Sequence, residues 1–461
     1  MVSAAHDSLV RDLRAILGRA AVLDGVPAAY LHDATESHGL RGAAAAVVVP
    51  ESPEQVAQAV AFCHARGIAV VPRGGGTGYA GGAVPLDGEV VVSLERLDRV
   101  RALDPLAWRM HVEAGVTTAH VHRLARDNGL AFPPDPGAAE SSQIGGNIAT
   151  NAGGPHAFKY GVTGRWVMGL EAVVAPGELI ELGGAVRKDV AGYDLRSLLV
   201  GSEGTLGIVT AAWLRLIPAP ERRCALVGFY PDVRTGCAAI EAAMGSGVVP
   251  AAIEFVDGDA LAIMEATGRS LGAAGHGFAV IVEADGSAAE VEIARGELHQ
   301  ALAPGAAELV APGDDAGTGA VWEWRRTVSH AVVAWRGGKI GEDIAVPLDR
   351  LADAVEGTAA IGRRHDLPTC SYGHAGDGNV HSSLLVGRDD EDGHRRARAA
   401  CEELFALAVE LGGTVSGEHG VGVFKNGQLR RQWSPQAVAL HRAVKAAFDP
   451  RNLFNPGKKL A

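Results

Sequence analysis

The chain has 461 residues, which is too long for one ordinary hydrophobic core, so we expect two or three domains. Its formal net charge is -12 at pH 7 and it carries no cluster of Lys and Arg, which argues against a nucleic-acid-binding protein. An anionic substrate would therefore need a local positive pocket. The cysteines lack the C-x-x-C spacing of an iron–sulfur or zinc cluster; they are Cys63, Cys224, Cys237, Cys370 and Cys401.

Residues 1 to about 40 predict a helical lead-in. Asp7, Arg11 and Asp12 interrupt its short apolar groups, which indicates an amphipathic helix rather than a signal peptide. No stretch of about twenty uninterrupted apolar residues is present, so we expect no transmembrane segment. A reducing cytoplasm suits the scattered cysteines, and peripheral contact with the inner face of a membrane stays open.

Residues 43–49 predict a strand that leads into a helix. Ser52 is the expected N-cap, Pro53 the first helical residue and Gln55 the capping-box partner, while Gly67 ends the helix. A second apolar run at residues 69–71 then leads into a glycine-rich loop. This strand–helix–strand unit positions the loop.

Residues 74–82 contain six glycines in nine positions, so the backbone N–H groups can close around an anion such as a pyrophosphate. A glycine-rich turn without a ligand is the alternative. A Rossmann loop leads directly into a helix, but here Pro85 blocks an immediate helix and a further apolar run follows at residues 90–94. We therefore expect a strand–loop–strand cradle.

Strand, helix and loop signals continue to about residue 217. We expect strands at residues 110–114 and 208–217, a helix at 118–128, and a turn flanked by residues 170–175 and 185–187. Residues 145–154 are rich in Gly and Asn, which allows close backbone approach to a ligand, although a long surface loop is the alternative. Ser202, Gly204 and Thr205 offer donors for phosphate or flavin oxygens, whereas Glu203 could be a solvated loop carboxylate.

The pattern changes beyond the stiff Pro218-Ala219-Pro220 boundary. Strand-like runs at residues 225–229, 252–255 and 278–284 alternate with alanine-rich helices. We expect a small antiparallel sheet with helices on one side, forming a cap or substrate domain.

Histidines and carboxylates gather in two short motifs near the C-terminal end. His374 and His381 flank a glycine-rich turn, and Glu418 and His419 are adjacent. Together they supply three candidate metal ligands and one further imidazole. Single structural histidines are the alternative, but two such groups in one chain favour a metal site.

Three glycine-rich segments, residues 71–82, 144–154 and 201–210, resemble the FAD-linked oxidases of the vanillyl-alcohol oxidase and p-cresol methylhydroxylase type. Residues 445–458 also match the closing motif of that family. The resemblance looks closest to FAD-dependent D-lactate dehydrogenases, the flavin subunit of glycolate oxidase and D-2-hydroxyglutarate dehydrogenases. It implies an α+β fold with a two-lobed FAD-binding domain of the p-cresol methylhydroxylase type and an α+β cap domain with an antiparallel sheet.

The resemblance also implies domain boundaries and a set of cofactor-binding residues. We expect a helical lead-in at residues 1–40, the FAD-binding domain at 41–219, the cap domain with the metal site at 220–440, and a segment returning to the FAD-binding domain at 441–461. Thr77 and Tyr79 stand where some relatives carry a tethering histidine, so we expect non-covalent FAD. The cofactor-binding residues implied are Pro72, Arg73, Gly74, Gly75, Gly76, Thr77, Gly78, Gly145, Gly146, Asn147, Thr150, Asn151, Gly153, Gly154, Ser202, Glu203, Gly204, Gly207, Ile208 and Asn455.

By the same resemblance His374, His381 and Glu418 bind a divalent metal, expected to be zinc, and His419 is the catalytic base. A bound metal can lower the pKa of coordinated water from 15.7 to about 7, and a coordinated alcohol becomes removable by an imidazole in the same way. The implied reaction is oxidation of a D-2-hydroxy acid, with D-lactate or glycolate favoured, to the 2-oxo acid by hydride transfer to flavin N5 with metal-assisted deprotonation.

The substrate carboxylate is expected to meet a guanidinium, since that fork matches a carboxylate with two hydrogen bonds. The candidate is Arg325, with Arg326 as the fallback and a solvated helix face as the alternative. The other substrate residues implied are Ser329, Lys339 and Ser383. Ser329 and Ser383 stand where hydroxyglutarate enzymes have threonine and asparagine, so a second carboxylate is less securely accommodated.

Two other functions stay open: D-2-hydroxyglutarate oxidation, and a non-catalytic flavin subunit of a glycolate oxidase complex. The intact set of His374, His381, Glu418 and His419 argues against the second. Without cluster-binding cysteines, electrons must leave to an external acceptor such as a quinone, a cytochrome or an electron-transfer protein. Oligomerisation stays open.

Overall fold

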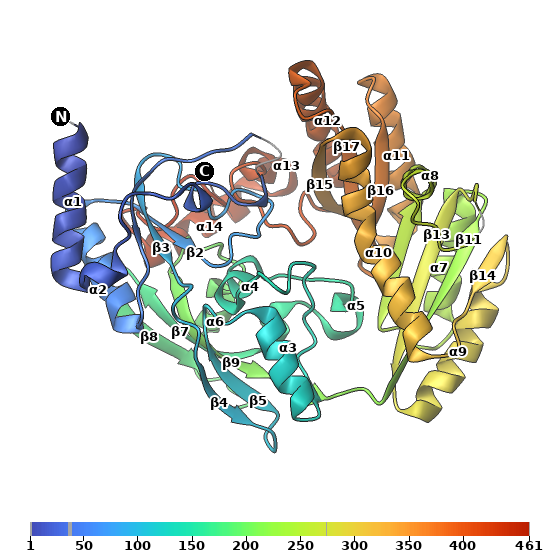
Figure 1. Cartoon of the computed structure of the whole chain (residues 1–461), viewed down its shortest axis with the longest axis horizontal. Coiled ribbons are helices and arrows are strands. Elements are labelled where there is room, and N and C mark those ends of the chain that lie inside the picture. The colour runs from blue at the N-terminus through green and yellow to red at the C-terminus, as the bar shows by residue number, and fades with distance from the viewer. Residues whose placement is uncertain (1, 36–38, 273, 461) are drawn as a thin grey trace. The chain divides into compact units, whose positions relative to one another are not determined.

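The structure is a computed structural model that describes residues 2–35, 39–272 and 274–460 (Figure 1). The chain forms two compact units. Unit 1 comprises Met1–Gly153, Val162–Ala219 and Glu418–Ala461, and unit 2 comprises Gly154–Gly161 and Pro220–Gly417. The domain boundaries expected from the sequence stay a prediction. None of the described helices is long and apolar enough to cross a membrane.

Unit 1 contains two main sheets and a short strand pair. A parallel sheet has the order β1-β3-β2, an antiparallel sheet has the order β4-β5-β9-β7-β8, and β10 pairs with β6. Its strands are β1 Ala44–Val48, β2 Val70–Arg73, β3 Glu89–Ser93, β4 Val100–Asp104, β5 Arg109–Glu113, β6 Leu130–Ala131, β7 Val167–Val174, β8 Glu178–Gly183, β9 Ile208–Arg215 and β10 Ile217–Pro218. Its helices are α1 Val2–Leu17, η1 Arg19–Ala21, η2 Ala28–Tyr30, α2 Pro53–Arg66, α3 Thr118–Asp127, α4 Ile144–Thr150, η4 Thr163–Trp166, α6 Leu195–Leu199, η7 Asn426–Gln428, α13 Leu429–Gln432 and α14 Pro435–Phe448.

Helix α2 begins and ends close to where the sequence predicts. Ser52 Oγ accepts a hydrogen bond from Gln55 N at 3.3 Å, and Gly67 ends the helix in the left-handed conformation with φ 69°. The capping box is incomplete, because Gln55 Oε1 accepts from Glu51 N at 2.8 Å. The buried face of α2 packs with α1 and the parallel sheet in one apolar core.

The glycine-rich loop connects two parallel neighbours, β2 and β3, and residues 74–88 contain no helix. The expected strand–loop–strand arrangement is therefore confirmed, and the Rossmann alternative is excluded. A late segment of the chain lies beside β2, since Val70 N donates to Leu453 O at 2.8 Å and Asn455 N donates to Val70 O at 2.8 Å. Unit 1 thus brings its first strands together with its last residues.

Two expectations for unit 1 differ from the structure. The long surface loop that was the alternative for residues 145–154 is excluded at its start, because residues 144–150 form helix α4; this helix lies close to Ala114, since a Cβ at Gly145 would be 2.6 Å from Ala114 Cβ. The turn expected between residues 175 and 185 is shorter, because β7 ends at Val174 and β8 already begins at Glu178; residues 185–187 lie outside the sheet. Val186 is 57% exposed, so this short apolar run has no buried surface to hold it in a strand.

Unit 2 is built on a seven-stranded sheet with the order β14-β11-β13-β12-β16-β17-β15, in which every pairing is antiparallel. Its strands are β11 Arg222–Tyr230, β12 Ala252–Asp257, β13 Phe278–Gly286, β14 Glu308–Val310, β15 Lys339–Ala345, β16 Thr369–His374 and β17 Asn379–Leu385. Its helices are α5 Ala157–Tyr160, α7 Val233–Gly245, α8 Gly258–Ala266, α9 Ala288–Leu302, α10 Asp315–Arg336, η5 Leu348–Arg350, α11 Leu351–Arg364, η6 Ala375–Asp377 and α12 Glu391–Glu410.

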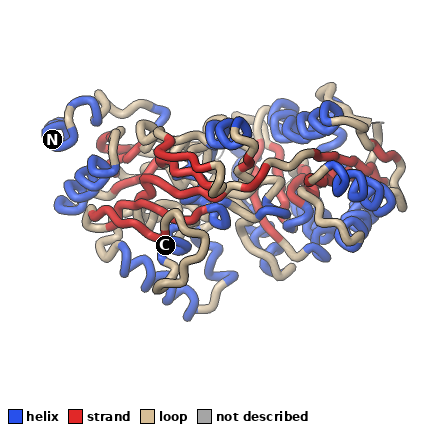
Figure 2. Tube along the Cα trace, turned by 90° about the horizontal axis from the view of Figure 1, so that it is seen from below, coloured by secondary structure: helices blue, strands red, loops and turns tan. Residues whose placement is uncertain are grey.

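Helices cover both faces of this sheet, so the expectation of helices on one side is wrong (Figure 2). Helices α8 and α10 share one apolar core with Val227 and Phe229. On the other face Tyr230 OH donates to the Leu302 carbonyl of α9 at 2.8 Å, and Thr358 of α11 lies 2.9 Å from Ser382 across their hydroxyl oxygens. Strand β12 shows the physical reason: its side chains are buried at every position, whereas a strand covered on one face only would alternate between buried and exposed side chains.

Candidate functional site

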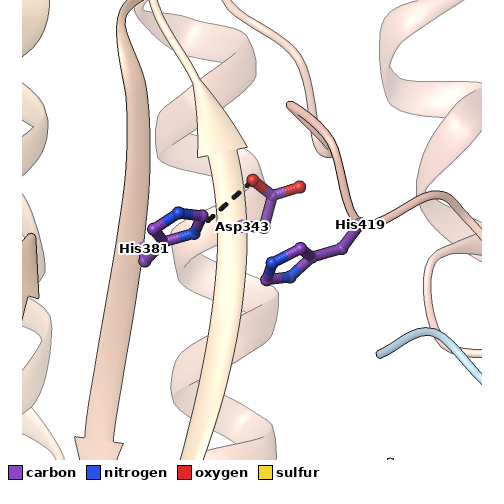
Figure 3. A group of neighbouring side chains, drawn as sticks. All are labelled: Asp343, His381 and His419. Atoms are coloured by element: carbon purple, nitrogen blue, oxygen red, sulfur yellow. Dashed lines mark ion pairs between the residues drawn. The ribbon is translucent and has the colours of Figure 1, made fainter. Parts of the chain in front are cut away.

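Unit 2 carries chemically active side chains on the sheet face that α8 and α10 cover. His374 ends β16, His381 lies on β17 and Asp343 lies on β15. The antiparallel registers place Asp343 opposite His381 and Glu254 opposite His374. Because side chains alternate along strands, these residues share one face. Figure 3 shows Asp343 and His381 projecting from neighbouring strands.

The two imidazoles, His374 and His381, converge through the same ring nitrogen. Their Nε2 atoms lie 3.5 Å apart, and the rings are nearly perpendicular, at 89°. His374 Nδ1 lies 2.5 Å from Glu254 Oε1. An ionised carboxylate only accepts, so Nδ1 of His374 carries the proton and Nε2 keeps its lone pair. This carboxylate–histidine arrangement suits a metal ligand.

Arg325 lies beside this pair on α10, with only 9% of its surface exposed. Its Nη2 atom lies 2.7 Å from Oε2 of Glu254, which is itself fully buried. Its Nε atom is buried and has no hydrogen-bond partner among residues 2–35, 39–272 and 274–460. A buried guanidinium with a donor to spare fits an anionic ligand. The fallback, Arg326, is exposed and pairs with Glu323 at 3.2 Å.

Lys339, Ser329 and Tyr372 form a second polar group near Arg325. Lys339 Nζ donates to Ser329 Oγ at 3.0 Å and to Tyr372 OH at 2.6 Å, and the Arg325 guanidinium lies 5.2 Å from the Tyr372 ring centre. Burial works to raise the pKa of Tyr372, but the Lys339 charge and hydrogen bond lower that pKa below its usual value. Ser383 lies on β17 opposite Gly341 and Cys370. The structure thus brings Ser329 and Lys339 together on this face.

The sequence reasoning missed two buried carboxylates, Asp343 and Glu254. Asp343 Oδ2 accepts from Gly417 N at 2.8 Å and from Ser416 Oγ at 3.1 Å, and its Oδ1 accepts from Asn379 Nδ2 at 2.5 Å and lies 3.8 Å from His381 Nδ1 (Figure 3). A signal for Glu254 was available, since it is a charged residue inside the apolar run 252–256. Buried charges need partners, and such a residue marks a site.

Glu418 and His419 begin the last stretch of unit 1 and follow Gly417 directly in the chain. Within unit 1 the His419 ring centre lies 4.6 Å from that of Tyr79, at the glycine-rich loop. Glu418 Oε1 lies 3.9 Å from His419 Nε2, and a Cβ at Gly153 would be 2.8 Å from Glu418 Oε2. These two residues therefore lie among the glycine-rich segments of unit 1.

The glycine-rich loop of unit 1 presents a row of backbone donors. Within the described part of the chain, no residue accepts a hydrogen bond from the backbone N–H groups of Gly74, Gly75, Gly76, Thr77 or Gly78. Gly74 approaches α4 closely, because a Cβ there would lie 3.3 Å from Gly146 Cα. Four of these five consecutive residues are glycines without a side chain of their own, and such a row of backbone donors suits a pyrophosphate.

Arg73, expected to bind the cofactor, turns back into the protein. Its Nη1 donates to His32 O at 2.8 Å and its Nη2 to Ala29 O at 2.8 Å. Gly76 has φ 67°, and a Cβ there would be 2.0 Å from Arg73 Nη2, so the guanidinium lies against this glycine. In this arrangement Arg73 shapes the loop through its side chain.

Several other expected cofactor residues also use their side chains within unit 1. Glu203 accepts hydrogen bonds from Val421 N at 2.9 Å and Gly422 N at 2.7 Å and pairs with Lys459 at 3.1 Å. Asn455 Nδ2 donates to Glu203 O at 2.7 Å. These contacts leave mainly backbone groups for a ligand.

The remaining expected cofactor residues divide between the two units. Asn147 donates to Thr118 Oγ1 at 2.6 Å, Thr150 to Gly146 O at 3.1 Å, and Asn151 Oδ1 accepts from Gly164 N at 2.8 Å. Gly154 belongs to unit 2, whereas the others lie in unit 1, including Pro72, Gly145, Gly153, Ser202, Gly204, Gly207 and Ile208.

Comparison with known families identifies the class of protein. The C-terminal domain of FAD linked oxidases matches residues 219–459, and an FAD binding domain matches residues 44–183. The chain belongs to the FAD-linked oxidases, and it is an FAD-binding oxidoreductase. The resemblance expected from the sequence is confirmed.

Individual relatives match along nearly their whole length. The glycolate oxidase subunit GlcD of Bacillus subtilis (strain 168) is 36% identical over 434 residues, which cover 94% of this chain and 92% of the relative. The D-2-hydroxyglutarate dehydrogenase of Xanthomonas citri pv. viticola is 35% identical, covering 90% and 88%. The D-lactate dehydrogenase of Archaeoglobus fulgidus is 35% identical, covering 89% and 90%.

Solved structures of the same fold are more distant in sequence. p-Cresol methylhydroxylase with substrate bound has a TM-score of 0.79 at 17% identity, covering 98% of this chain and 96% of that chain. A 4-ethylphenol oxidase from Gulosibacter chungangensis, in an isoeugenol complex, has a TM-score of 0.80 at 18% identity, covering 99% and 97%. They confirm the expected α+β class with a p-cresol methylhydroxylase-type FAD-binding fold.

Proposed function

We propose that the chain is an FAD-dependent dehydrogenase that oxidises a D-2-hydroxy acid, with D-lactate or glycolate favoured, to the 2-oxo acid. The observation that carries the proposal is the pair of His374 and His381 Nε2 atoms, 3.5 Å apart beside the buried Arg325. Such a substrate carries both a hydroxyl and a carboxylate on adjacent carbons. A metal-ligand pair next to a guanidinium offers a partner to each group.

In this proposal His374, His381 and Glu418 hold a divalent metal ion, and zinc is the expected ion for nitrogen and oxygen donors. The orientation of His374 by Glu254 supports the ligand assignment, since metal-bound histidines usually donate their other ring N–H to a carboxylate or carbonyl. When bound, the metal supplies Lewis acidity that makes an alcohol hydroxyl easier to deprotonate. Glu418 is included among the proposed metal ligands because it directly follows Gly417 in the chain, and Gly417 N donates a hydrogen bond to Asp343.

His419 is the proposed base that takes the hydroxyl proton. An imidazole with an ordinary pKa of about 6.5 can accept a proton at neutral pH. Its neighbour Tyr79, with ring centres 4.6 Å apart, restricts the orientation of the imidazole. The flavin, when bound, supplies the hydride acceptor.

Arg325 is the proposed partner of the substrate carboxylate, because its buried Nε donor is still to be satisfied. Lys339 already donates to Ser329 and Tyr372, which favours a short substrate with one carboxylate. D-2-Hydroxyglutarate would need one of these hydrogen bonds to be exchanged for its second carboxylate. Because of this exchange, D-2-hydroxyglutarate is the less favoured of the proposed substrates.

The bound FAD is proposed to be non-covalent and to pass its electrons to an external quinone, cytochrome or electron-transfer protein. All five cysteines are buried and outside any disulfide within the described residues, and no two of them have the C-x-x-C spacing of a cluster. The relative from Bacillus subtilis is named as a subunit, which supports a search for a protein partner. Flavin released by denaturation would support the non-covalent assignment, and flavin retained on the polypeptide would contradict it.

The test is anaerobic bleaching of the flavin absorbance in the full-length protein. D-Lactate, L-lactate, glycolate and D-2-hydroxyglutarate are mixed with it in turn, with and without a chelator. Bleaching by D-lactate or glycolate that the chelator abolishes is the expected result. Faster bleaching by D-2-hydroxyglutarate would select the rival substrate, and bound flavin that none of the acids reduces would favour a non-catalytic flavin subunit.

A further inference from the structure

We infer that Glu254 is a positioning residue that holds both His374 and Arg325 with one carboxylate, so that metal binding and substrate-carboxylate binding depend on the same side chain. This inference rests on the proposed function, since it concerns the residues assigned there to the metal and to the substrate. Glu254 is not itself expected to touch the metal or the substrate.

The sheet topology gives Glu254 its place. Strand β12 lies between β13 and β16, and Glu254 is directly opposite His374 across the β12–β16 pairing. Directly opposed side chains of an antiparallel pair lie close enough to interact. The residue is 0% exposed, so water does not compete for its oxygens. Its position is therefore fixed by the backbone of a strand inside the sheet.

The two carboxylate oxygens are used differently. Oε1 lies 2.5 Å from His374 Nδ1 and so selects the tautomer whose Nε2 lone pair faces His381. Oε2 lies 2.7 Å from Arg325 Nη2 and anchors one arm of the guanidinium, while the Nε donor stays without a partner in the described residues. One oxygen thus prepares a ligand for a cation, and the other orients a donor for an anion.

The charge balance explains why the carboxylate is needed in both roles. A buried guanidinium is costly unless a negative charge lies beside it, and a buried carboxylate is equally costly alone. The Glu254–Arg325 pair meets both requirements in the absence of substrate. A neutral glutamine keeps one carbonyl oxygen that can accept from His374 Nδ1, but it carries no negative charge to pair with the Arg325 guanidinium.

Another buried carboxylate of the same strand gives a matched comparison. Asp257 accepts from Ser371 N at 2.6 Å and from Ala260 N at 2.8 Å, where it caps α8. Its hydrogen-bond partners within the described residues are backbone N–H groups, and neither a histidine nor an arginine donates to it. Substitution of Asp257 by asparagine replaces a buried carboxyl group of β12 and leaves the proposed ligand residues unchanged.

The experiment compares divalent-metal affinity in the full-length wild-type protein, Glu254→Gln and Asp257→Asn. Zinc binding is measured by competition with a chromophoric chelator, a readout that does not depend on turnover. We expect Glu254→Gln to weaken zinc binding about 10- to 100-fold, the usual effect of losing such a partner of a ligating histidine. Asp257→Asn should bind zinc as the wild type does. The KM for D-lactate should also rise in Glu254→Gln beyond any change in Asp257→Asn, because Arg325 loses its anchor.

The outcomes separate this inference from the function on which it rests. Equal zinc affinity in wild type and Glu254→Gln overturns the inference, whereas a wild-type protein that binds no zinc overturns the proposed ligand set. If Glu254→Gln does not fold, as judged by circular dichroism, Glu254→Asp takes its place, because it keeps the charge and shortens the reach. Weakened zinc binding by folded Glu254→Asp supports the inference, and unchanged zinc binding with unchanged KM contradicts it.

Discussion

The glycine-rich loop of unit 1 and the sheet face of unit 2 are built from opposite materials. The loop offers backbone N–H groups at residues 74–78, and its nearby side chains, such as Arg73, are turned into the protein. The sheet face offers side chains, with Glu254 and Asp343 holding the groups around them. A site made of backbone is broken by adding atoms, and a site made of side chains is broken by removing them.

Because of this difference, substitutions in the two regions should affect different ligands. A change confined to the sheet face should alter metal and substrate binding while the flavin content stays at the wild-type level. A change confined to the loop should lower the flavin content while zinc affinity stays unchanged. Each variant below is therefore assayed for both ligands.

The largest effect is expected for His374→Ala. The variant loses the imidazole whose Nε2 faces His381 at 3.5 Å, so we expect a fall in kcat/KM of about 1,000-fold or more, on the order of 4 kcal/mol. Steady-state turnover of D-lactate with an artificial acceptor measures the loss, and zinc content should fall with it. Flavin content should be unchanged. A variant that loses flavin to the same extent as zinc would contradict the proposal that the two regions bind different ligands.

A smaller effect is expected for Arg325→Lys. Lysine keeps the charge but lacks the planar fork, so we expect the KM for the 2-hydroxy acid to rise about 100-fold with a smaller change in kcat. Arg326→Lys is the matched control, because that neighbouring residue is exposed and pairs with Glu323 on the surface of the same helix. Equal effects of the two substitutions would remove Arg325 from the substrate site.

The loop is tested by Gly75→Ala. A Cβ at this position would be 2.1 Å from the Ser141 backbone oxygen, so the loop must shift away from its N–H arrangement. We expect FAD affinity to fall at least 10-fold, on the order of 1.4 kcal/mol, with zinc affinity unchanged. Gly82→Ala is the control, because a Cβ there meets nothing within 4 Å. Flavin absorbance after gel filtration reports the outcome, and full flavin retention by Gly75→Ala would contradict the backbone cradle.

The last prediction concerns stability alone and involves neither ligand site. Burial raises the pKa of Asp257 to about 7, whereas an aspartate in the unfolded chain titrates near 3.9. Between about pH 4 and pH 7 the folded state keeps a proton that the unfolded state has released, so this residue makes stability fall as pH rises through that window. The unfolding free energy of the wild type, relative to Asp257→Asn, should fall by at most about 4 kcal/mol across it. Urea titrations at several pH values measure the difference, and a flat profile would contradict the raised pKa.

The sequence was most informative where function depends on neighbours in the chain. The position of the glycine-rich loop, the end of α2 at Gly67 and the choice of a strand–loop–strand connection follow from local residue types. The helix phase could also have separated Arg325 from Arg326, because Val321, Trp324, Arg325 and Val328 share the buried face of α10.

The rest depends on strand pairing, which a single sequence does not reveal. Glu254 meets His374 across 120 positions of the chain, and Asp343 meets Gly417 across 74. No local pattern specifies which strands become neighbours. A sequence signal did exist for helices on both faces of the unit 2 sheet. Residues 252–256 are apolar apart from Glu254 and do not alternate with polar residues, which is typical of a strand buried on both faces. The expectation of helices on one side failed because this run was used only to predict a strand.

The pairing of residues 453–455 with β2 sets an order of events during synthesis. Val70 emerges from the ribosome early, but Leu453 and Asn455, its hydrogen-bond partners, follow only after the whole of unit 2 has been made. Strand β2 leads into the loop that offers its N–H groups, and Asn455 also donates to Gly82 O at 2.8 Å at the far end of that loop. The loop therefore has its complete frame only after residues 453–455 have been synthesised, and flavin loading is expected to follow that stage of synthesis.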